Sequence, residues 1–594
     1  MNLSEKQKEI VNAPIGEAMQ VLASAGSGKT RVLTERIKYI LNNSRDGVIG
    51  ITFTNKAAEE MQNRLIDCEN INERAWIATI HSVAQHILER YEHTIGLDLH
   101  LYEREEDRIE IYLQFAKENG FDIEKENIKK YIEKFSWIKR ELILEKEDFF
   151  NKYPNEMDIW EYYQNYQNAL LNSAGMDYDD MLLYAYKLLR DNESICKIYR
   201  AKYKHICVDE AQDLNKAQYE LIKILCGDAI KSILMVGDKN QMIYGFNGSS
   251  SDYLCKFFVE DFKPKKYELI ENFRSTKEVI RVSNILKPNS QKEMEYAYTG
   301  LVEFNICETE DSEANWIIEK INSFLNLKED KEIEGEISLD KMVVIARNRF
   351  ALCKLKEKLK ENNILYFFKK GERDYLLESQ FGQILDYSIR CKLNSKNWID
   401  KNKLDVLLKT EGKFNSIYNQ LLNFIDDLDI EEPNIPKFIK SMDDIFSNIG
   451  KNLENDKEIE ELNHSKSDLD MFNSYWTKFK RLGLGNSLNS FYNALALGKL
   501  TSNSNNGGLT LSTVHTMKGL EKDIVFLIGM CEGIFPDYRA TSNKEIEEER
   551  NNAFVAVTRA KRWLFVSYPQ QRMTQWGGSR FQTASRFFME MKAV

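Results

Sequence analysis

The stretch Ala23–Thr30 reads ASAGSGKT, and it decides the fold of this chain. It follows the apolar run Met19–Leu22 and precedes a helical pattern over Arg31–Leu41, so it joins a buried strand to a helix. The string matches the phosphate-binding pattern GxxxxGK[ST], with alanine in place of the first glycine. Gly26 and Gly28 let backbone N–H groups converge on phosphate oxygens, and the helix adds the positive end of its dipole. The order strand, loop, helix therefore predicts an α/β fold that binds a nucleotide.

Two polar side chains at the end of this loop suit a nucleoside triphosphate. Lys29 would reach the β and γ phosphates, and the hydroxyl of Thr30 would ligate Mg²⁺. Such a loop also needs carboxylates on a neighbouring strand, one for the metal and one for water. The segment His205–Leu214, HICVDEAQDL, supplies them: Asp209 would hold Mg²⁺ through water, and Glu210 would orient and deprotonate the attacking water. Together the two motifs predict hydrolysis of a nucleoside triphosphate.

Further short β-branched runs are apolar at nearly every position, which is typical of strands buried on both faces of a parallel sheet. These runs are Met19–Leu22, Val48–Ile51, Ile206–Val208, Ile233–Val236, Met342–Ala346, Ile524–Ile528 and Leu564–Val566. They form two groups, before about residue 280 and after about residue 340, and a long stretch of helical pattern interrupts each group. We therefore expect two α/β cores, each carrying a mainly helical insertion.

The composition sets the class of protein. With 594 residues, at roughly 150 residues per domain, the chain has room for about four domains. Its nine cysteines are scattered without a CxxC pair, which argues against a zinc site, an iron–sulfur cluster or a disulfide framework. No apolar run approaches the ~18 residues of a membrane span, and the N-terminal sequence lacks the apolar region of a secretory signal. We therefore expect a cytoplasmic protein without a membrane partner.

The charge balance is acidic. Lys and Arg number 82 against 93 Asp and Glu, a net charge of −11. At first sight this excess of acid argues against a nucleic-acid partner, because phosphate backbones attract basic surfaces.

The string DEAQD, taken with the phosphate loop, resembles superfamily 1 DNA helicases of the UvrD/Rep/PcrA type. Further stretches resemble the motifs of that family in the family's order. They are LSEKQKEIV at Leu3–Val11, ITFTNKAAEEM at Ile51–Met61, TIHS at Thr79–Ser82, VGDKNQMIYGFNG at Val236–Gly248, LIENFRST at Leu269–Thr276, VHTMKGLE at Val514–Glu521, EGIFP at Glu532–Pro536, ERNNAFVAVTRA at Glu549–Ala560 and ASRF at Ala584–Phe587. The resemblance spans both cores, whereas the two insertions match more by position than by sequence.

The resemblance implies a division into two RecA-like domains with parallel sheets and two insertions. Core 1A would comprise residues 1–93 and 201–280, and its helical insertion 1B would comprise residues 94–200. Core 2A would comprise residues 281–371 and 507–594. Its helical insertion 2B, residues 372–506, is shorter than in the family's housekeeping members.

The resemblance also implies ATP and Mg²⁺ as ligands. The nucleotide-binding residues would be Gln7, Ala25, Gly26, Ser27, Gly28, Lys29, Thr30, Arg31, Phe273, Gly519 and Glu521, and the metal-binding residues Thr30 and Asp209. Among them, Gln7 would read adenine, Arg31 and Phe273 would sandwich it, and Glu521 would contact the ribose. Catalysis would rest on Glu210, on Gln241 at the γ-phosphate, and on Arg274 and Arg559 as arginine fingers. Arginine suits this role because its planar, permanently charged group stabilises charge that develops on phosphoryl oxygens.

A track for single-stranded DNA needs aromatic faces that stack on bases, each worth roughly 1–3 kcal/mol, and polar groups for the backbone. By family position these residues are Phe53, Thr54, Asn55, His81, Tyr244, Phe246, His515 and Trp576. Relatives usually carry Trp-Arg where this chain has Phe246-Asn247, and that arginine helps to couple the nucleotide site to the DNA track.

The resemblance implies an ATP-dependent 3′→5′ translocase and helicase that acts on single-stranded DNA and 3′-tailed duplexes. Two alternatives stay open at the level of sequence. The chain could be a DNA-sensing ATPase subunit that gates a partner such as a nuclease, as in Gabija-type phage defence. It could also be a motor that strips proteins from single strands with little unwinding.

Overall fold

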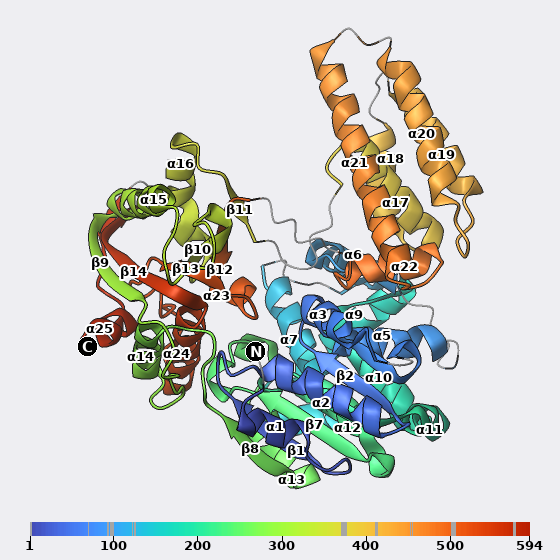
Figure 1. Cartoon of the computed structure of the whole chain (residues 1–594). Coiled ribbons are helices and arrows are strands. Elements are labelled where there is room, and N and C mark those ends of the chain that lie inside the picture. Colours follow the sequence, from blue (N-terminus) through green and yellow to red (C-terminus); the bar gives the residue numbers. More distant parts are fainter. Residues whose placement is uncertain are drawn as a thin grey trace. The chain divides into compact units, whose positions relative to one another are not determined.

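The computed structural model describes residues 3–68, 71–91, 94, 100–121, 123, 126–369, 377–409, 414–451, 453, 455–500, 507–573 and 578–593 (Figure 1). The chain forms two compact units. Unit 1 consists of Met1–Ile80, Glu193–Gly371 and Asn503–Val594, and it contains two large β-sheets. Unit 2 consists of His81–Asn192 and Glu372–Ser502 and is mainly helical. Among the described residues, no helix is both long and apolar enough to cross a membrane.

The first sheet of unit 1 has six parallel strands in the order β3-β2-β6-β7-β1-β8. In chain order they are β1 (Met19–Ala23), β2 (Gly47–Thr52), β3 (Ala75–Thr79), β6 (Tyr203–Val208), β7 (Ser232–Gly237) and β8 (Lys265–Leu269). Every residue of β2 and β7 is buried, which accounts for their uninterrupted apolar sequence. The accompanying helices are α1 (Glu5–Val11), α2 (Lys29–Asn43), α3 (Asn55–Leu65), α4 (Ile71–Arg74), α11 (Glu193–Lys202), α12 (Lys216–Cys226) and α13 (Phe258–Phe262).

The strand order of this sheet brings three motifs together. The phosphate loop follows β1, Asp209 follows β6, and Asp238 follows β7. Because β7 lies between β1 and β6, the carboxyl ends of these parallel strands bring the three segments to one edge of the sheet. Ligands of open α/β sheets bind at this edge.

The second sheet of unit 1 runs β11-β12-β10-β13-β14-β15, and β9 also pairs with β14. All pairings are parallel except β14 with β15. The strands are β9 (Leu301–Thr309), β10 (Met342–Ala346), β11 (Tyr366–Phe368), β12 (Leu509–Thr513), β13 (Lys522–Leu527), β14 (Ala560–Met573) and β15 (Ser579–Phe581). The helices of this part are α14 (Lys277–Leu286), α15 (Glu310–Leu327), α16 (Cys353–Glu361), α23 (Val514–Met517), α24 (Asn543–Val557) and α25 (Arg586–Lys592). A buried apolar cluster lies on each side of the sheet, one containing Val343 and Val525 and the other Val344 and Phe526.

Unit 2 contains most helices of the two predicted insertions, without α11, together with one helix from the segment predicted as core 1A. The first stretch forms α5 (Ile80–Tyr91), α6 (Glu105–Asn119), α7 (Ile128–Arg140), α8 (Lys146–Lys152), α9 (Met157–Asn172) and α10 (Tyr178–Asp191), with a two-stranded pair of β4 (His100–Leu101) and β5 (Gly175–Met176). The second forms α17 (Gln380–Leu393), α18 (Trp398–Leu408), α19 (Asn415–Asp427), α20 (Ile435–Gly450), α21 (Asp456–Arg481) and α22 (Leu488–Ala496). Each stretch has a hydrophobic core rich in aromatic residues, and Ile399 of the second packs into the core of the first.

The predicted fold class is confirmed: two parallel sheets of the α/β type are accompanied by helical regions. All seven predicted apolar runs lie in strands or overlap them. The sequence did not predict β3, β8, β9, β11, β12 and β15, because most of them mix polar with apolar residues. In β8, for example, burial alternates with exposure along Lys265–Leu269. The division into the four domains 1A, 1B, 2A and 2B stays a prediction. The structure divides into two compact units, one containing both sheets and the other containing most of the two insertions.

Candidate nucleotide-hydrolysis site and aromatic track

The phosphate loop has a backbone that only glycine adopts easily. Gly26 and Gly28 have φ of +74° and +82°, the left-handed region in which a side chain is strained. A Cβ atom on Gly26 would collide with Oδ1 of Asn272. The loop is also held from outside: the backbone N–H of Phe273 donates to the Gly26 carbonyl at 2.9 Å, and Nε2 of Gln7 donates to the Ser27 carbonyl at 2.9 Å. The loop is therefore a preformed cradle of backbone N–H groups at the start of α2.

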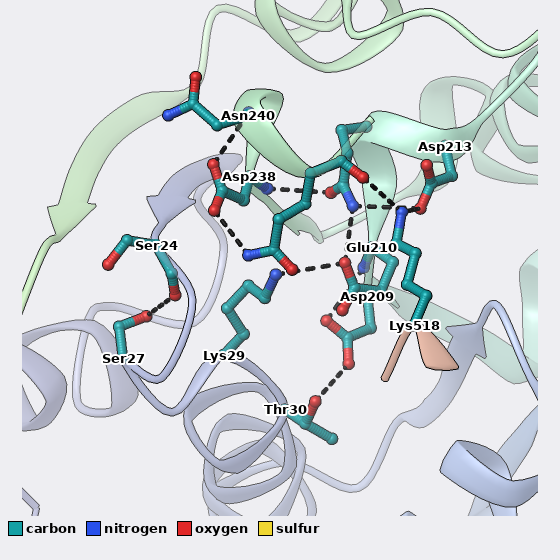
Figure 2. A network of polar contacts seen from close by, with 12 residues as sticks. Ser24, Ser27, Lys29, Thr30, Asp209, Glu210, Asp213, Asp238, Asn240 and Lys518 are labelled. Carbon is teal, nitrogen blue, oxygen red and sulfur yellow. Dashed lines mark hydrogen bonds and ion pairs between the residues drawn. The ribbon is translucent and has the colours of Figure 1, made fainter. Parts of the chain in front are cut away.

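The two carboxylates at the end of β6 contact the first turn of α2 (Figure 2). Oγ1 of Thr30 donates to Oδ2 of Asp209 at 2.7 Å, and Nζ of Lys29 lies 3.2 Å from Oε2 of Glu210. Burial raises the pKa of Asp209, and the neighbouring Glu210 raises it further. Burial opposes the charge of Glu210 as well, but Lys29 and Lys518 outweigh it and lower its pKa. Glu210 is therefore the more acidic member of the pair, and its carboxylate is held ionised where it can orient a water molecule.

The residues at this point fit Mg²⁺. The hydroxyl of Thr30 and the carboxylate of Asp209 are hard oxygen donors on adjacent elements, in direct contact with each other. Mg²⁺ is bound in phosphate sites through one or two such oxygens together with water and the phosphates of the substrate. The donor set is thus of the kind that a nucleotide-bound magnesium ion uses.

A hydrogen-bonded chain extends from Glu210 to the segment after β7. Nε2 of Gln212 donates to Glu210 at 2.6 Å and to Asp213 at 3.1 Å, and Oε1 of Gln212 accepts the backbone N–H of Asp238 at 2.9 Å. Asp238 in turn accepts from Nε2 of Gln241 at 2.6 Å. Gln241 is 3% exposed, so its orientation is set by these contacts. The predicted γ-phosphate contact is thereby linked to the predicted general base.

The two predicted arginine fingers come from segments beside the second sheet, and one of them contacts this hydrogen-bonded network. Nη2 of Arg559 donates to Oε1 of Gln241 at 3.4 Å. Burial and the neighbouring Arg274 lower the pKa of Arg559 to about 9, which still leaves it charged at neutral pH. Arg274 forms an ion pair with Glu521 and donates to the Thr558 carbonyl at 3.4 Å. Both guanidinium groups are therefore held by protein contacts, and that of Arg559 contacts Gln241.

Four of the predicted DNA-contacting side chains form one aromatic group, made of Phe53, Tyr244, Phe246 and His515. Phe53 and Tyr244 are stacked, with ring centroids 4.8 Å apart and an interplanar angle of 25°. His515 lies 6.0 Å from Tyr244 and 5.5 Å from Phe246, ring centre to ring centre. Phe246 is 66% exposed, an uncommon exposure for so large an apolar ring. The group combines residues that follow β2, β7 and β12, and it offers flat faces of the kind on which bases stack.

The other predicted site residues are dispersed. Thr54 caps α3 and accepts the Ala57 N–H, and Asn55 begins that helix. His81 belongs to unit 2, where it lies edge-on to Tyr178. Ala25 is buried in the phosphate loop, Arg31 is in the first turn of α2, and Gly519 has φ of +80° beside Glu521. Trp576 lies outside the described residues.

Several buried polar side chains of the site received no role from the sequence, among them Gln212, Asp238 and Lys518. Each lies inside a motif that the sequence singled out, so its type and position were visible. What was missing was the partner, because each contacts a residue from another segment. Lys518 provides the clearest case, since its ammonium group contacts the Asp213 carboxylate across 305 residues of sequence (Figure 2).

Comparison with known proteins gives two family matches and relatives that are similar over nearly the whole chain. Residues 3–263 match the UvrD/REP helicase N-terminal domain, and residues 400–571 match the UvrD-like helicase C-terminal domain. The chain is 28% identical to the ATP-dependent DNA helicase PcrA of Staphylococcus epidermidis over 648 residues, covering 99% of this chain and 86% of the relative. It is equally similar to the protein of the same name from Staphylococcus aureus, at 28% identity over 646 residues with the same coverage.

Proposed function

This chain belongs to the UvrD/REP helicase family as an ATP-dependent DNA helicase, and from that premise we propose how it works. ATP hydrolysis drives it in the 3′→5′ direction along single-stranded DNA, and it unwinds duplexes that carry a 3′ single-stranded tail. The observation that carries the motor mechanism is the contact of Arg559 with Gln241, in which a residue beside the second sheet reaches the nucleotide network of the first, whereas the direction rests on the family resemblance.

The hydrolysis step follows from the charges of the site. Glu210, whose pKa is lowered by Lys29 and Lys518 against the effect of burial, takes the proton of the attacking water. Lys29, Arg274 and Arg559 stabilise the charge that develops on the transferred phosphoryl group. Magnesium, held by Thr30 and Asp209, supplies further neutralisation of the phosphate charge. Gln241 senses the γ-phosphate because its amide is already oriented by Asp238.

Coupling to movement requires that the γ-phosphate be contacted from both sheets. Lys29 belongs to the first sheet's loop, and Arg559 precedes β14 of the second. ATP draws the two groups of residues together, and loss of the γ-phosphate after hydrolysis releases them. If each core grips the strand in turn, closing and opening move the protein along it.

The aromatic group holds the strand by stacking. Phe53, Tyr244 and Phe246 follow strands of the first sheet and His515 follows β12 of the second, so relative movement of the two cores acts directly on stacked bases. Stacking does not depend on base identity, which suits a motor that must move over any sequence. Thr54, Asn55, His81 and Trp576 supply further strand contacts in this proposal.

The test is strand displacement by the purified chain on duplexes with a 3′ tail, with a 5′ tail, or with blunt ends. We expect ATP-dependent displacement of the 3′-tailed duplex only. The Lys29→Ala variant should lose both displacement and ATPase activity, because it removes the phosphate-binding ammonium. Preference for the 5′ tail would refute the polarity, and intact ATPase in Lys29→Ala would refute the site assignment. DNA-stimulated ATPase without displacement would favour a sensor that gates a partner or a protein-stripping motor.

A further inference from the structure

Besides lowering the pKa of Glu210, Lys518 directly contacts three groups of the first sheet's segments. The residue ends α23, in the segment that follows β12 of the second sheet, and its side chain is 6% exposed. Its ammonium group lies against three acceptors from the first sheet's segments. These are the Asp213 carboxylate, the Gln241 carbonyl oxygen at 2.6 Å, and the ring of Tyr244, whose centroid is 4.9 Å away.

The chemistry of these contacts fixes the position of the side chain. A lysine ammonium has three N–H donors and no acceptor, and here a carboxylate, a carbonyl and an aromatic face surround it. A buried charge is tolerated only where it is paired and hydrogen-bonded, so the loss of any of the three contacts carries a cost. Lys518 is therefore held by all three partners at once.

The three partners belong to two different sites. Asp213 shares Nε2 of Gln212 with Glu210, the predicted general base. The Gln241 carbonyl belongs to the residue whose side chain contacts Arg559. Tyr244 stacks on Phe53, and its hydroxyl donates to the His515 carbonyl at 3.3 Å. One ammonium group thus contacts the hydrolysis network and the aromatic group directly.

We propose that Lys518 is a positioning residue that couples DNA stacked on the aromatic group to the hydrolysis network. A base stacked on the exposed Phe246, whose ring lies edge-on to Tyr244 at 6.1 Å, holds the Tyr244 ring in place, and that ring holds the ammonium group against Asp213 and the Gln241 backbone. Bound DNA thereby stabilises the alignment of the catalytic carboxylate and glutamine. This proposal rests on the proposed function, because it concerns the stimulation of ATP hydrolysis by DNA.

The experiment compares ATPase rates with and without oligothymidine in wild type, Lys518→Met and Lys518→Gln. We expect Lys518→Met to reduce the DNA-stimulated kcat about tenfold, the range of single coupling residues. The KM for ATP should change much less, and the ratio of the kcat with DNA to the kcat without DNA should fall. Lys518→Gln keeps a hydrogen-bond donor without the charge. The stimulation of its ATPase by DNA should therefore lie between that of wild type and that of Lys518→Met. Lys320→Met is the matched control, since Lys320 pairs with Glu303 at 2.6 Å and lies over Trp316 and Phe565, away from the site.

A double-mutant cycle separates coupling from mere destabilisation. Tyr244→Leu removes the ring, and in the Tyr244→Leu background Lys518→Met should have little further effect on the DNA-stimulated kcat. Additive losses in that cycle, or a stimulated Lys518→Met enzyme equal to wild type, would overturn the role of Lys518. If the Lys518→Met chain does not fold, as judged by circular dichroism, the same comparison is made with Lys518→Gln. A wild-type ATPase that DNA does not stimulate would instead refute the proposed function.

Discussion

At the scale of single residues, the phosphate loop depends on a contact that lies far from it in sequence. Asn272 accepts the backbone N–H groups of Arg274 and Ser275 and is 1% exposed, so its side chain cannot move aside. Its amide packs where a side chain on Gly26 would be. The same asparagine thus shapes the backbone of an arginine finger and the floor of the phosphate loop. A glycine is required at position 26 both for its φ and for this close approach.

Replacement of Gly26 by alanine should therefore cause both backbone strain and a collision with Asn272, whereas a control glycine should show the strain alone. Gly120 has a similar φ, +72°, but among the described residues no atom lies within 4 Å of the place that a Cβ would take there. Gly120→Ala therefore carries only the backbone strain of roughly 1–2 kcal/mol. We expect Gly26→Ala to abolish binding of a fluorescent ATP analogue, and Gly120→Ala to retain it with a modest loss of thermal stability. Equal nucleotide affinity in the two variants would contradict the role given to Asn272.

A second prediction at this scale concerns the exposed ring of the aromatic group. Phe246→Ala removes a stacking face worth roughly 1–3 kcal/mol per base, so the DNA-stimulated ATPase should require much more DNA. The ATPase without DNA should stay close to wild type, because the ring contacts of Phe246 are with Tyr244 and His515 of the aromatic group. Phe581→Ala on β15 is the control, since that ring is 67% exposed against 66% for Phe246. Equal loss of both activities in Phe246→Ala would rule out stacking.

At the scale of elements, unit 2 contains a buried ion cluster that ties its helices together. Lys139 of α7 lies 2.7 Å from Asp177 and 2.8 Å from Asp180, at the start of α10, and all three side chains are buried. Arg108 of α6 lies 3.7 Å from the same Asp177, and the hydroxyl of Tyr166 in α9 donates to it at 3.1 Å. Four helices thus meet at one carboxylate. Their relative positions depend on charges that must stay paired.

Removal of the central cation should therefore loosen α7 and α10. Lys139→Met leaves two carboxylates buried beside each other, and breaking a buried pair from one side costs about 3–5 kcal/mol. Lys134→Met on the same helix removes the exposed contact with Glu156, which is worth about 0–1 kcal/mol. Hydrogen exchange followed by mass spectrometry should show faster exchange of α7 and α10 in the first variant only. Comparable exchange in both variants would show that the cluster does not hold the helices.

At the scale of the whole molecule, the acidic composition is compatible with DNA binding because the strand is gripped locally. The net charge of −11 is spread over 594 residues. The aromatic group is a small surface that binds bases by stacking, without electrostatic attraction of the whole protein to phosphates. A motor must also release its strand in each cycle, and a strongly basic surface would oppose release. The helicase assignment and the acidic balance therefore agree.

This balance predicts how salt affects the two forms of DNA. Binding of blunt duplex rests mainly on phosphate contacts, so its affinity should fall steeply between about 50 and 200 mM salt. Binding of oligothymidine rests more on stacking and should persist over that range. Fluorescence anisotropy with labelled DNA measures both. Duplex binding that resists salt as well as single-strand binding does would mean that a basic surface, and not the aromatic group, dominates the grip.

The family, the fold class, the phosphate loop and the DEAQD carboxylates can all be identified from the amino-acid sequence alone. This identification is possible because the strand, the loop and the next helix are contiguous in sequence, and the residues that give the loop its chemistry are adjacent to one another. Only the tertiary structure decided which distant side chains meet. Arg559 contacts Gln241 across 318 residues and Lys518 contacts Asp213 across 305, and no local pattern contains these pairs. These pairs join segments of the two sheets, which belong to one compact unit, and buried charges there must find partners, so the packing of the sheets and the cost of burying charge select the contacts.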